Sequence, residues 1–95
     1  MEFRWDPNKD AANQRKHSVG FREAATVFHD PLSTTFPDYD HSASEQRFLT
    51  IGVSVRGRVM VVAHAEQGDT IRIISARQAT KRERKFYEED QSQTN

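Results

Sequence analysis

The residues with the clearest chemical potential are the cationic side chains between positions 71 and 85, a stretch with six basic groups and one acidic group. Arg72 and Arg77 belong to an expected strand or just follow it, and Lys81, Arg84 and Lys85 come next at helical spacing. One side of this strand–helix corner is therefore cationic, which suits contact with a phosphate backbone. The alternative is a solvated basic helix face beside a core strand, which is a common arrangement.

Two histidines are candidates for proton transfer, because imidazole titrates near neutral pH. His41 lies in an acidic loop, four residues before Glu45, and a nearby carboxylate would orient its ring. The alternative is a hydrogen bond to Asp38 or Glu45 that only fixes the loop. His17 follows Lys16 at the expected end of a helix, where a protonated histidine that caps the helix C-terminus explains it equally well.

The acidic loop does not have the pattern of a metal site. Its spacing matches no structural zinc motif, and loops that bind hard cations carry more oxygen donors at regular intervals; the residues concerned are Asp38, Asp40, His41 and Glu45. The chain contains no cysteine, so disulfides and thiolate metal ligands are excluded. We expect neither a metal nor a cofactor.

Length and charge indicate one small domain with local charged sites. The 95 residues predict a single domain over residues 1–90 and a disordered tail over 91–95. Fourteen basic and fourteen acidic residues give zero net charge, which argues against a general polyanion binder. No signal peptide is visible, and no apolar run reaches the roughly 20 residues of a membrane span. We expect a soluble, cytoplasmic protein without membrane contact.

The N-terminal half predicts a short strand and two helices. Phe3 and Trp5 alternate with polar residues as in a strand, and Asp6-Pro7 then supplies an N-cap and a first helical residue. This helix should run to about His17, and one of its faces is either a polar solvent face or part of a binding rim, formed by Lys9, Asn13, Lys16 and His17. A second helix follows Gly20 and ends at Asp30-Pro31, with an apolar stripe of Phe21, Ala24, Ala25 and Phe28.

The C-terminal half predicts a β-meander and a last helix. Alternating apolar residues indicate strands over 47–55, 59–66 and 70–76, and a short edge strand is expected at 34–36. Thr80 and Glu83 form a capping box, so the helix should begin within 76–81 and pack through Phe86 and Tyr87. The fold class is α+β: an antiparallel three- to four-stranded sheet with two N-terminal helices and one C-terminal helix.

Ordered motifs over residues 3–88 resemble the BrnT toxins. The first are Trp5-Asp-Pro, Asn13-x-x-Lys16-His17 and Phe21-x-x-Ala24-x-x-x-Phe28-x-Asp30-Pro31. The later ones are Asp38-x-x-His41-Ser-x-x-Glu45-x-Arg47, Ile51-Gly-x-Ser54, Gly57-Arg58 and Arg72-Ile-Ile-Ser-Ala-Arg77-x-Ala-Thr-x-x-Glu83-x-x-x-Tyr87. One departure is visible: the family usually has a glycine after Lys-His and a polar N-cap before the phenylalanine, whereas here Ser18 and Gly20 look exchanged.

The resemblance implies a type II toxin, a small ribonuclease with a RelE-like fold that arrests growth and is held inactive by a BrnA-type antitoxin. That antitoxin family carries a ribbon-helix-helix DNA-binding part. The complex is expected to be a heterotetramer that represses its own operon, so contact with DNA would come only through the antitoxin.

Metal-independent RNA cleavage needs charge stabilisation at the phosphate and proton transfer at two oxygens. Arg58, Arg72 and Arg77 are the candidates for the first task, and His41 or His17 for the second. Arg72 lies within an isoleucine-rich strand, so it needs an acidic partner or a groove, and the alternative is a structural salt bridge to Glu45 or Asp38. Further RNA contacts are expected at Lys16, His17, Lys81, Arg84 and Lys85.

Two other functions compete with the nuclease. In the first, the chain is a non-catalytic module whose basic corner binds an acidic partner chain and helps to repress the operon. In the second, the chain binds DNA directly, but zero net charge and the lack of a recognition-helix pattern weigh against this.

Overall fold

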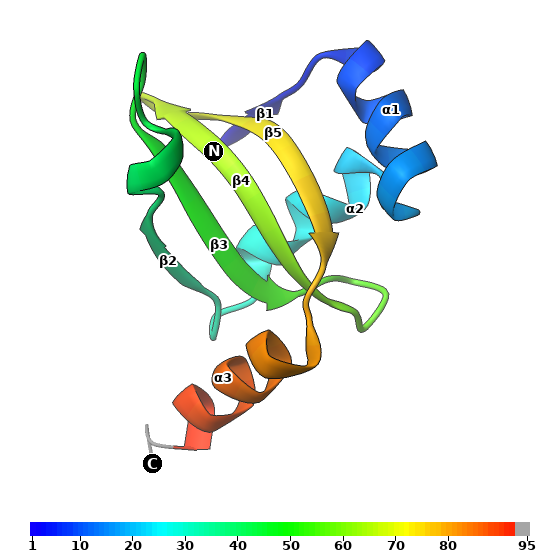
Figure 1. Ribbon diagram of the computed structural model, residues 1–95, viewed down its shortest axis with the longest axis vertical. Helices are drawn as coiled ribbons and strands as arrows, with labels where there is room; N and C mark the ends of the chain where they lie inside the picture. The colour runs from blue at the N-terminus through cyan, green and yellow to red at the C-terminus, as the bar shows by residue number, and fades with distance from the viewer. Residues whose placement is uncertain (93–95) are drawn as a thin grey trace.

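In the computed structural model, which describes residues 1–92, a twisted sheet lies between helices that come from the two ends of the chain (Figure 1). The sheet has five strands in the order β1-β5-β4-β3-β2. The elements are β1 (Glu2–Arg4), α1 (Pro7–His17), α2 (Phe21–Thr26), the 3₁₀ turn η1 (Val27–His29), β2 (Thr34–Pro37), the 3₁₀ turn η2 (Tyr39–His41), β3 (Arg47–Val53), β4 (Val59–Gln67), β5 (Thr70–Gln78) and α3 (Lys81–Ser92).

The α+β class is confirmed, but the sheet is larger than the sequence predicts. It has five strands instead of three or four, and it is mixed, because β1 pairs in parallel with β5 through Phe3 opposite Ile71. A three-residue strand carries too little periodicity to reveal its neighbour in the sheet. Helix α3 runs to Ser92, two residues into the segment 91–95 that the sequence predicts to be a disordered tail. Residues 93–95 lie outside the part of the chain that the structure describes.

Helix α2 covers one face of the sheet, as its apolar stripe predicts. Phe21 and Ala24 are fully buried, and they join a core that includes Met60, Val62 and Ile73 of the central strands. The second helix, which the sequence predicts to end at Asp30-Pro31, is α-helical only to Thr26 and continues as a 3₁₀ turn over Val27–His29. Burial of a large apolar side chain such as Phe21 or Met60 stabilises the folded state by about 1.5–3 kcal/mol, before the cost of ordering entropy is subtracted.

Helix α3 covers only one end of the opposite face (Figure 1). Its Tyr87 is 7% exposed and shares a small core with Ile51, Val61 and Ala79. Phe86 was predicted to pack as well, and this is wrong, because it is 47% exposed. The capping box is confirmed: the Glu83 N–H donates to Thr80 Oγ1 at 3.2 Å, and the Thr80 N–H donates to Glu83 Oε1 at 2.9 Å. The rest of this face of the sheet stays open.

Asn13 attaches α1 to the edge of β5. Its side chain is 7% exposed, so it does not lie on a polar solvent face, which was one of the two alternatives that the sequence left open. Asn13 Nδ2 donates to Ala76 O at 2.8 Å, and Asn13 Oδ1 accepts from the Ala76 N–H at 3.1 Å. Strand β1 pairs only with residues 70–72, so here the asparagine amide takes the place of a neighbouring strand. His17, one helical turn later, is thereby held at this edge.

The serine and glycine that look exchanged after α1, Ser18 and Gly20, affect the backbone conformation and the cap of α2. Ser18 adopts the left-handed conformation with φ 58°, a position that glycine occupies without steric cost. Gly20 offers no side-chain cap to α2, and the N–H of Phe21 instead donates to Asp10 Oδ1 at 2.9 Å. Helix α2 therefore begins correctly because a carboxylate of α1 replaces the missing cap.

His64 is a fully buried histidine in the layer between α2 and the sheet. Its ring lies 4.8 Å from that of Phe28 and 5.8 Å from that of Phe48, measured between centroids. His64 Nε2 shares a 2.7 Å hydrogen bond with Thr50 Oγ1, and Glu66 Oε1 lies 4.0 Å from Nδ1. Burial lowers the pKa of His64 from 6.5 to about 4. Burial therefore favours the neutral form of this histidine.

This lowered pKa predicts a loss of stability in mild acid. Because the unfolded chain binds the proton at a higher pH than the folded chain, stability is full above the unfolded pKa of 6.5 and falls between that value and about 4. The full loss is about 3 kcal/mol, from about 1.4 kcal/mol per pKa unit. Urea unfolding of wild type and His64→Gln, compared between about pH 7.5 and pH 5, should show a flatter dependence in the variant. Equal slopes would contradict this assignment.

Candidate functional site

A cleft lies on the face of the sheet that α3 leaves open. It has a volume of about 490 Å³, and its apolar lining comes from three neighbouring strands: Leu49, Val61, Ala63, Ile74 and Ala76. The polar lining comes from Ser75 and from residues with ionisable side chains: His17, Asp38, Asp40, His41, Arg47 and Arg77. The cleft thus joins an apolar floor to charged walls.

The walls come from elements that are far apart in the sequence. Helix α1 and the short turn η2 stand at two sides of the strands that form the floor (Figure 1). Of the predicted site residues, the structure brings His17, His41 and Arg77 to this cleft. The other predicted residues do not line it: Lys16, Arg58, Arg72, Lys81, Arg84 and Lys85.

His41 is held by a carboxylate. Its Nδ1 lies 3.0 and 3.1 Å from the two carboxylate oxygens of Asp38, and this is the contact that the loop-fixing alternative expected. The Asp38 side chain is only 12% exposed, whereas that of His41 is 68% exposed. The Asp38 backbone is itself fixed, because its N–H donates to Arg47 O at 2.8 Å and its carbonyl accepts from Ser42 Oγ at 2.6 Å. A ring held through Nδ1 presents Nε2 to its surroundings, as proton transfer requires.

Arg77 is held by Glu83 at the corner between β5 and α3. Its Nη1 and Nη2 donate to the two oxygens of Glu83 at 2.7 and 2.9 Å. These bonds lower the pKa of Glu83 to about 2 and raise the pKa of Arg77. Because Glu83 is also the capping-box residue of α3, the helix start fixes the direction of the guanidinium.

Arg47 and Arg72 are linked by one carboxylate. Arg72 forms an ion pair with Glu45, and Arg47 Nη2 lies 3.5 Å from the same oxygen, Glu45 Oε1. The acidic partner that the sequence demanded for Arg72 is therefore present, and Arg72 does not line the cleft. Sequence reasoning overlooked Arg47. Its alternation with Leu49 and Ile51 placed it on this face of the sheet, and that was the available signal.

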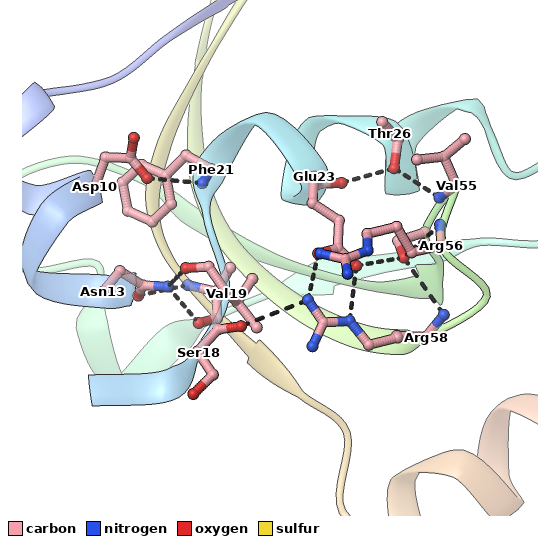
Figure 2. Close-up of polar contacts among 12 residues, drawn as sticks. Asp10, Asn13, Ser18, Val19, Phe21, Glu23, Thr26, Val55, Arg56 and Arg58 are labelled. Atoms are coloured by element: carbon pink, nitrogen blue, oxygen red, sulfur yellow. Dashed lines mark hydrogen bonds and ion pairs between the residues drawn. The ribbon is translucent and has the colours of Figure 1, made fainter. Parts of the chain in front are cut away.

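Arg58 belongs to a structural network on the other side of the sheet. Figure 2 shows its guanidinium against Glu23 of α2, with Nε 2.9 Å from Glu23 Oε2 and Nη2 paired with Oε1. Ser54 Oγ donates to the same carboxylate at 2.7 Å, and Arg56 lies 3.7 Å from it. These contacts, with those of Arg58 first, lower the pKa of Glu23 and raise that of Arg58. The network ties α2 to the β3–β4 turn.

The predicted cations of α3 are exposed and lie apart from the cleft. Arg84 Nη1 donates to Ala79 O at 3.1 Å, and Lys85 Nζ lies 3.9 Å from Glu89 Oε1. Within residues 1–92, no group of three or more histidine, aspartate or glutamate side chains is placed to hold a metal ion. Over the same residues, none of the helices combines the length and the apolar character needed to cross a membrane.

Comparison with known families identifies the chain. The family model described as "Ribonuclease toxin, BrnT, of type II toxin-antitoxin system" matches residues 5–83. The chain belongs to the BrnT family. The match spans every element from the start of α1 to the first turn of α3, so it includes all the residues of the cleft.

A solved BrnT toxin shares this fold. The 1.1 Å crystal structure of the Brucella abortus ribonuclease toxin BrnT matches with a TM-score of 0.67 at 24% sequence identity. The match covers 85% of this chain and 99% of the Brucella chain. Among curated proteins, none matches the chain.

The Arg58 network predicts a stability defect without a specific loss of function in this BrnT-family chain. Arg58→Ala leaves the Glu23 side chain, only 9% exposed, without its main partner. We expect the free energy of unfolding to fall by about 2–3 kcal/mol in urea denaturation. Arg56→Ala is the matched control, because Arg56 is 71% exposed and faces the same carboxylate; its cost should stay below about 1 kcal/mol. Equal costs for the two variants would contradict the network.

Proposed function

We propose that this chain is a metal-independent endoribonuclease that acts as the growth-arresting toxin of its toxin–antitoxin pair, and that the open cleft is its active site. The observation that carries the proposal is the convergence of His17, His41, Arg47 and Arg77 on one cleft from four separate elements. Two histidines and two arginines can supply the proton transfers and the charge stabilisation that metal-free phosphodiester cleavage requires.

The arginines take the electrostatic task. Arg77 is fixed by Glu83, so its guanidinium meets the phosphate without having to reorganise. Arg47 approaches from the start of β3 and adds a second positive charge on the same floor. Together they stabilise the negative charge that grows on the phosphate as the 2′-oxygen attacks.

The histidines take the proton transfers. His41, oriented by Asp38, presents Nε2 for proton exchange, and His17 approaches from the end of α1. One imidazole accepts the proton of the attacking 2′-OH, and the other donates a proton to the leaving 5′-oxygen. Which histidine has which role depends on the direction in which the RNA lies in the cleft.

The remaining predicted residues act at a distance from the scissile bond. Arg72 holds Glu45, which lies beside Arg47, so it supports a cleft residue instead of touching the phosphate. Lys81, Arg84 and Lys85 add positive charge to the α3 surface outside the cleft, and this proposal assigns them no contact with RNA. Arg58 has no part in this proposal, because its guanidinium belongs to the Glu23 network.

Membership of a type II family implies an antitoxin partner. We propose that this partner is a BrnA-type antitoxin with a ribbon-helix-helix DNA-binding part, that the complex is a heterotetramer, and that DNA is contacted only through the antitoxin. The proposed setting is the bacterial cytoplasm, where RNA and the antitoxin are both available. We propose a RelE-like fold for the chain on the basis of its resemblance to the BrnT toxins.

Substitution of Arg77 and His41 tests the active site. Arg77→Ala and His41→Ala should each lower RNA cleavage by about 100-fold or more, because each removes one part of the charge or proton chemistry. Cleavage is measured on purified, folded protein with EDTA present, so that a metal requirement would be visible. Arg82→Ala is the control, since Arg82 is an exposed arginine of α3 that does not line the cleft.

Full cleavage by both cleft variants would contradict the proposed site. Loss of all cleavage in EDTA, restored by a divalent cation, would contradict metal independence. Folded wild-type protein that binds its antitoxin and leaves RNA intact would favour the alternative function, a non-catalytic module that docks an acidic partner chain and co-represses the operon.

A further inference from the structure

A second, shallower groove continues from the cleft onto α1. It has a volume of about 230 Å³ and is lined by Lys9, Ala12, Asn13, Lys16, His17, Ile74 and Ser75. Three of these residues, His17, Ile74 and Ser75, also line the cleft. The two hollows therefore adjoin at the edge of β5, where these three residues belong to the walls of both.

The α1 groove and the η2 side of the cleft differ in charge. The α1 groove has Lys9, Lys16 and His17 in its lining and no carboxylate. The opposite end of the cleft carries Asp40, which lies in η2, and Asp38, the residue immediately before η2. A polyanion is therefore attracted toward α1 and repelled from the η2 end.

The two lysines of the groove are available for an external partner. Both are exposed, and within the described residues neither forms an ion pair. Arg77 and Arg47, in contrast, face carboxylates of their own chain. Lys9 and Lys16 lie on one face two turns apart, about 10 Å along the helix axis. They present two positive charges on flexible side chains, an arrangement that suits contacts with backbone phosphates.

We propose that the α1 groove is an extension subsite that binds the phosphates of single-stranded RNA on one side of the cleaved bond. This inference rests on the proposed ribonuclease function. The scissile phosphate lies over the cleft floor near Arg77, and the strand continues past Ser75 and His17 to Lys16 and then Lys9. Lysine contacts of this kind position the strand and carry no sequence information. The subsite therefore sets affinity and the direction of the strand, while the cleft performs the chemistry.

The cations of α3 offer the competing route. Lys81 and Lys85 are exposed, but neither lines the cleft or the α1 groove. The C-terminal part of the same helix is acidic, with Glu88, Glu89 and Asp90. A strand that followed α3 would meet these carboxylates within two turns, so the charge pattern favours the route over α1.

The test measures how salt weakens RNA binding. The probe is a fluorescent, 2′-O-methylated RNA of about 12 nucleotides, which the protein cannot cleave through a 2′-OH. Anisotropy titrations between about 50 and 200 mM salt give the slope of log K against log salt. The double variant Lys9→Gln/Lys16→Gln should bind more weakly at low salt, with the magnitude of its slope reduced by about 1.4, because each lost phosphate contact on a single strand removes about 0.7.

Two further variants control the experiment. Arg15→Gln removes one positive charge from the same helix outside the groove, and it should keep the wild-type slope. Lys81→Gln/Lys85→Gln removes two charges on the competing route, and it should also keep the slope. Cleavage of a dinucleotide, which occupies the cleft beside His17 and is too short to reach Lys16 and Lys9, should be equal in wild type and in the Lys9/Lys16 double variant.

The outcomes separate this inference from the function on which it rests. If wild type cleaves RNA and the Lys9/Lys16 double variant behaves like Arg15→Gln, the subsite is wrong and the nuclease stands. If the slope falls only in the α3 double variant, the strand follows α3 and the subsite is again wrong. If folded wild type neither binds the probe nor cleaves RNA, the function and the subsite are both wrong.

Discussion

The hydrogen bonds between the Asn13 amide and the backbone of Ala76 are the constraint on which the candidate site depends. They close the edge of β5 that β1 leaves open, and they hold α1 in place across 63 residues of sequence. Because the Asn13 amide donates one of these hydrogen bonds and accepts the other, no aliphatic or charged side chain can form both. Everything that α1 brings to the cleft and the adjacent groove, including His17, Lys16 and Lys9, is positioned through this contact.

Carboxylates organise the rest of the site. Asp38 orients His41, Glu83 orients Arg77, and Glu45 lies between Arg72 and Arg47. The carboxylates that pair with Arg77, Arg72 and Arg47 reduce the attraction of these cations for a distant phosphate, which agrees with the zero net charge of the chain. A site of this kind recognises a phosphate by local geometry, so the unpaired lysines of α1 are left to supply the longer-range attraction for RNA.

The sequence revealed what depends on neighbours along the chain. Asp6-Pro7 starts α1, and Thr80 with Glu83 starts α3, because capping joins residues two or three positions apart. The sequence offered Arg58 as a phosphate-binding candidate and could not reveal its contact with Glu23, which lies 35 residues away on another element. The burial of Asn13 was not foreseen for the same reason, and Arg47 was overlooked as a site residue although its strand was predicted. Local chemistry was therefore predictable, and the His41–Asp38 and Arg72–Glu45 contacts were among the alternatives that the sequence offered. The contact of Arg58 with Glu23 and that of Asn13 with Ala76 required the fold.

The central claim is that RNA binds over the floor of the open cleft, between α1 and η2. The most direct measurement is an amide NMR titration of the folded chain with a 2′-O-methylated RNA oligonucleotide. The account predicts that the largest chemical-shift changes fall at His17, Arg47, Ser75 and Arg77, with little change around Glu23 and Arg58. Changes confined to α3 or to the β3–β4 turn, with the cleft residues unmoved, would contradict it.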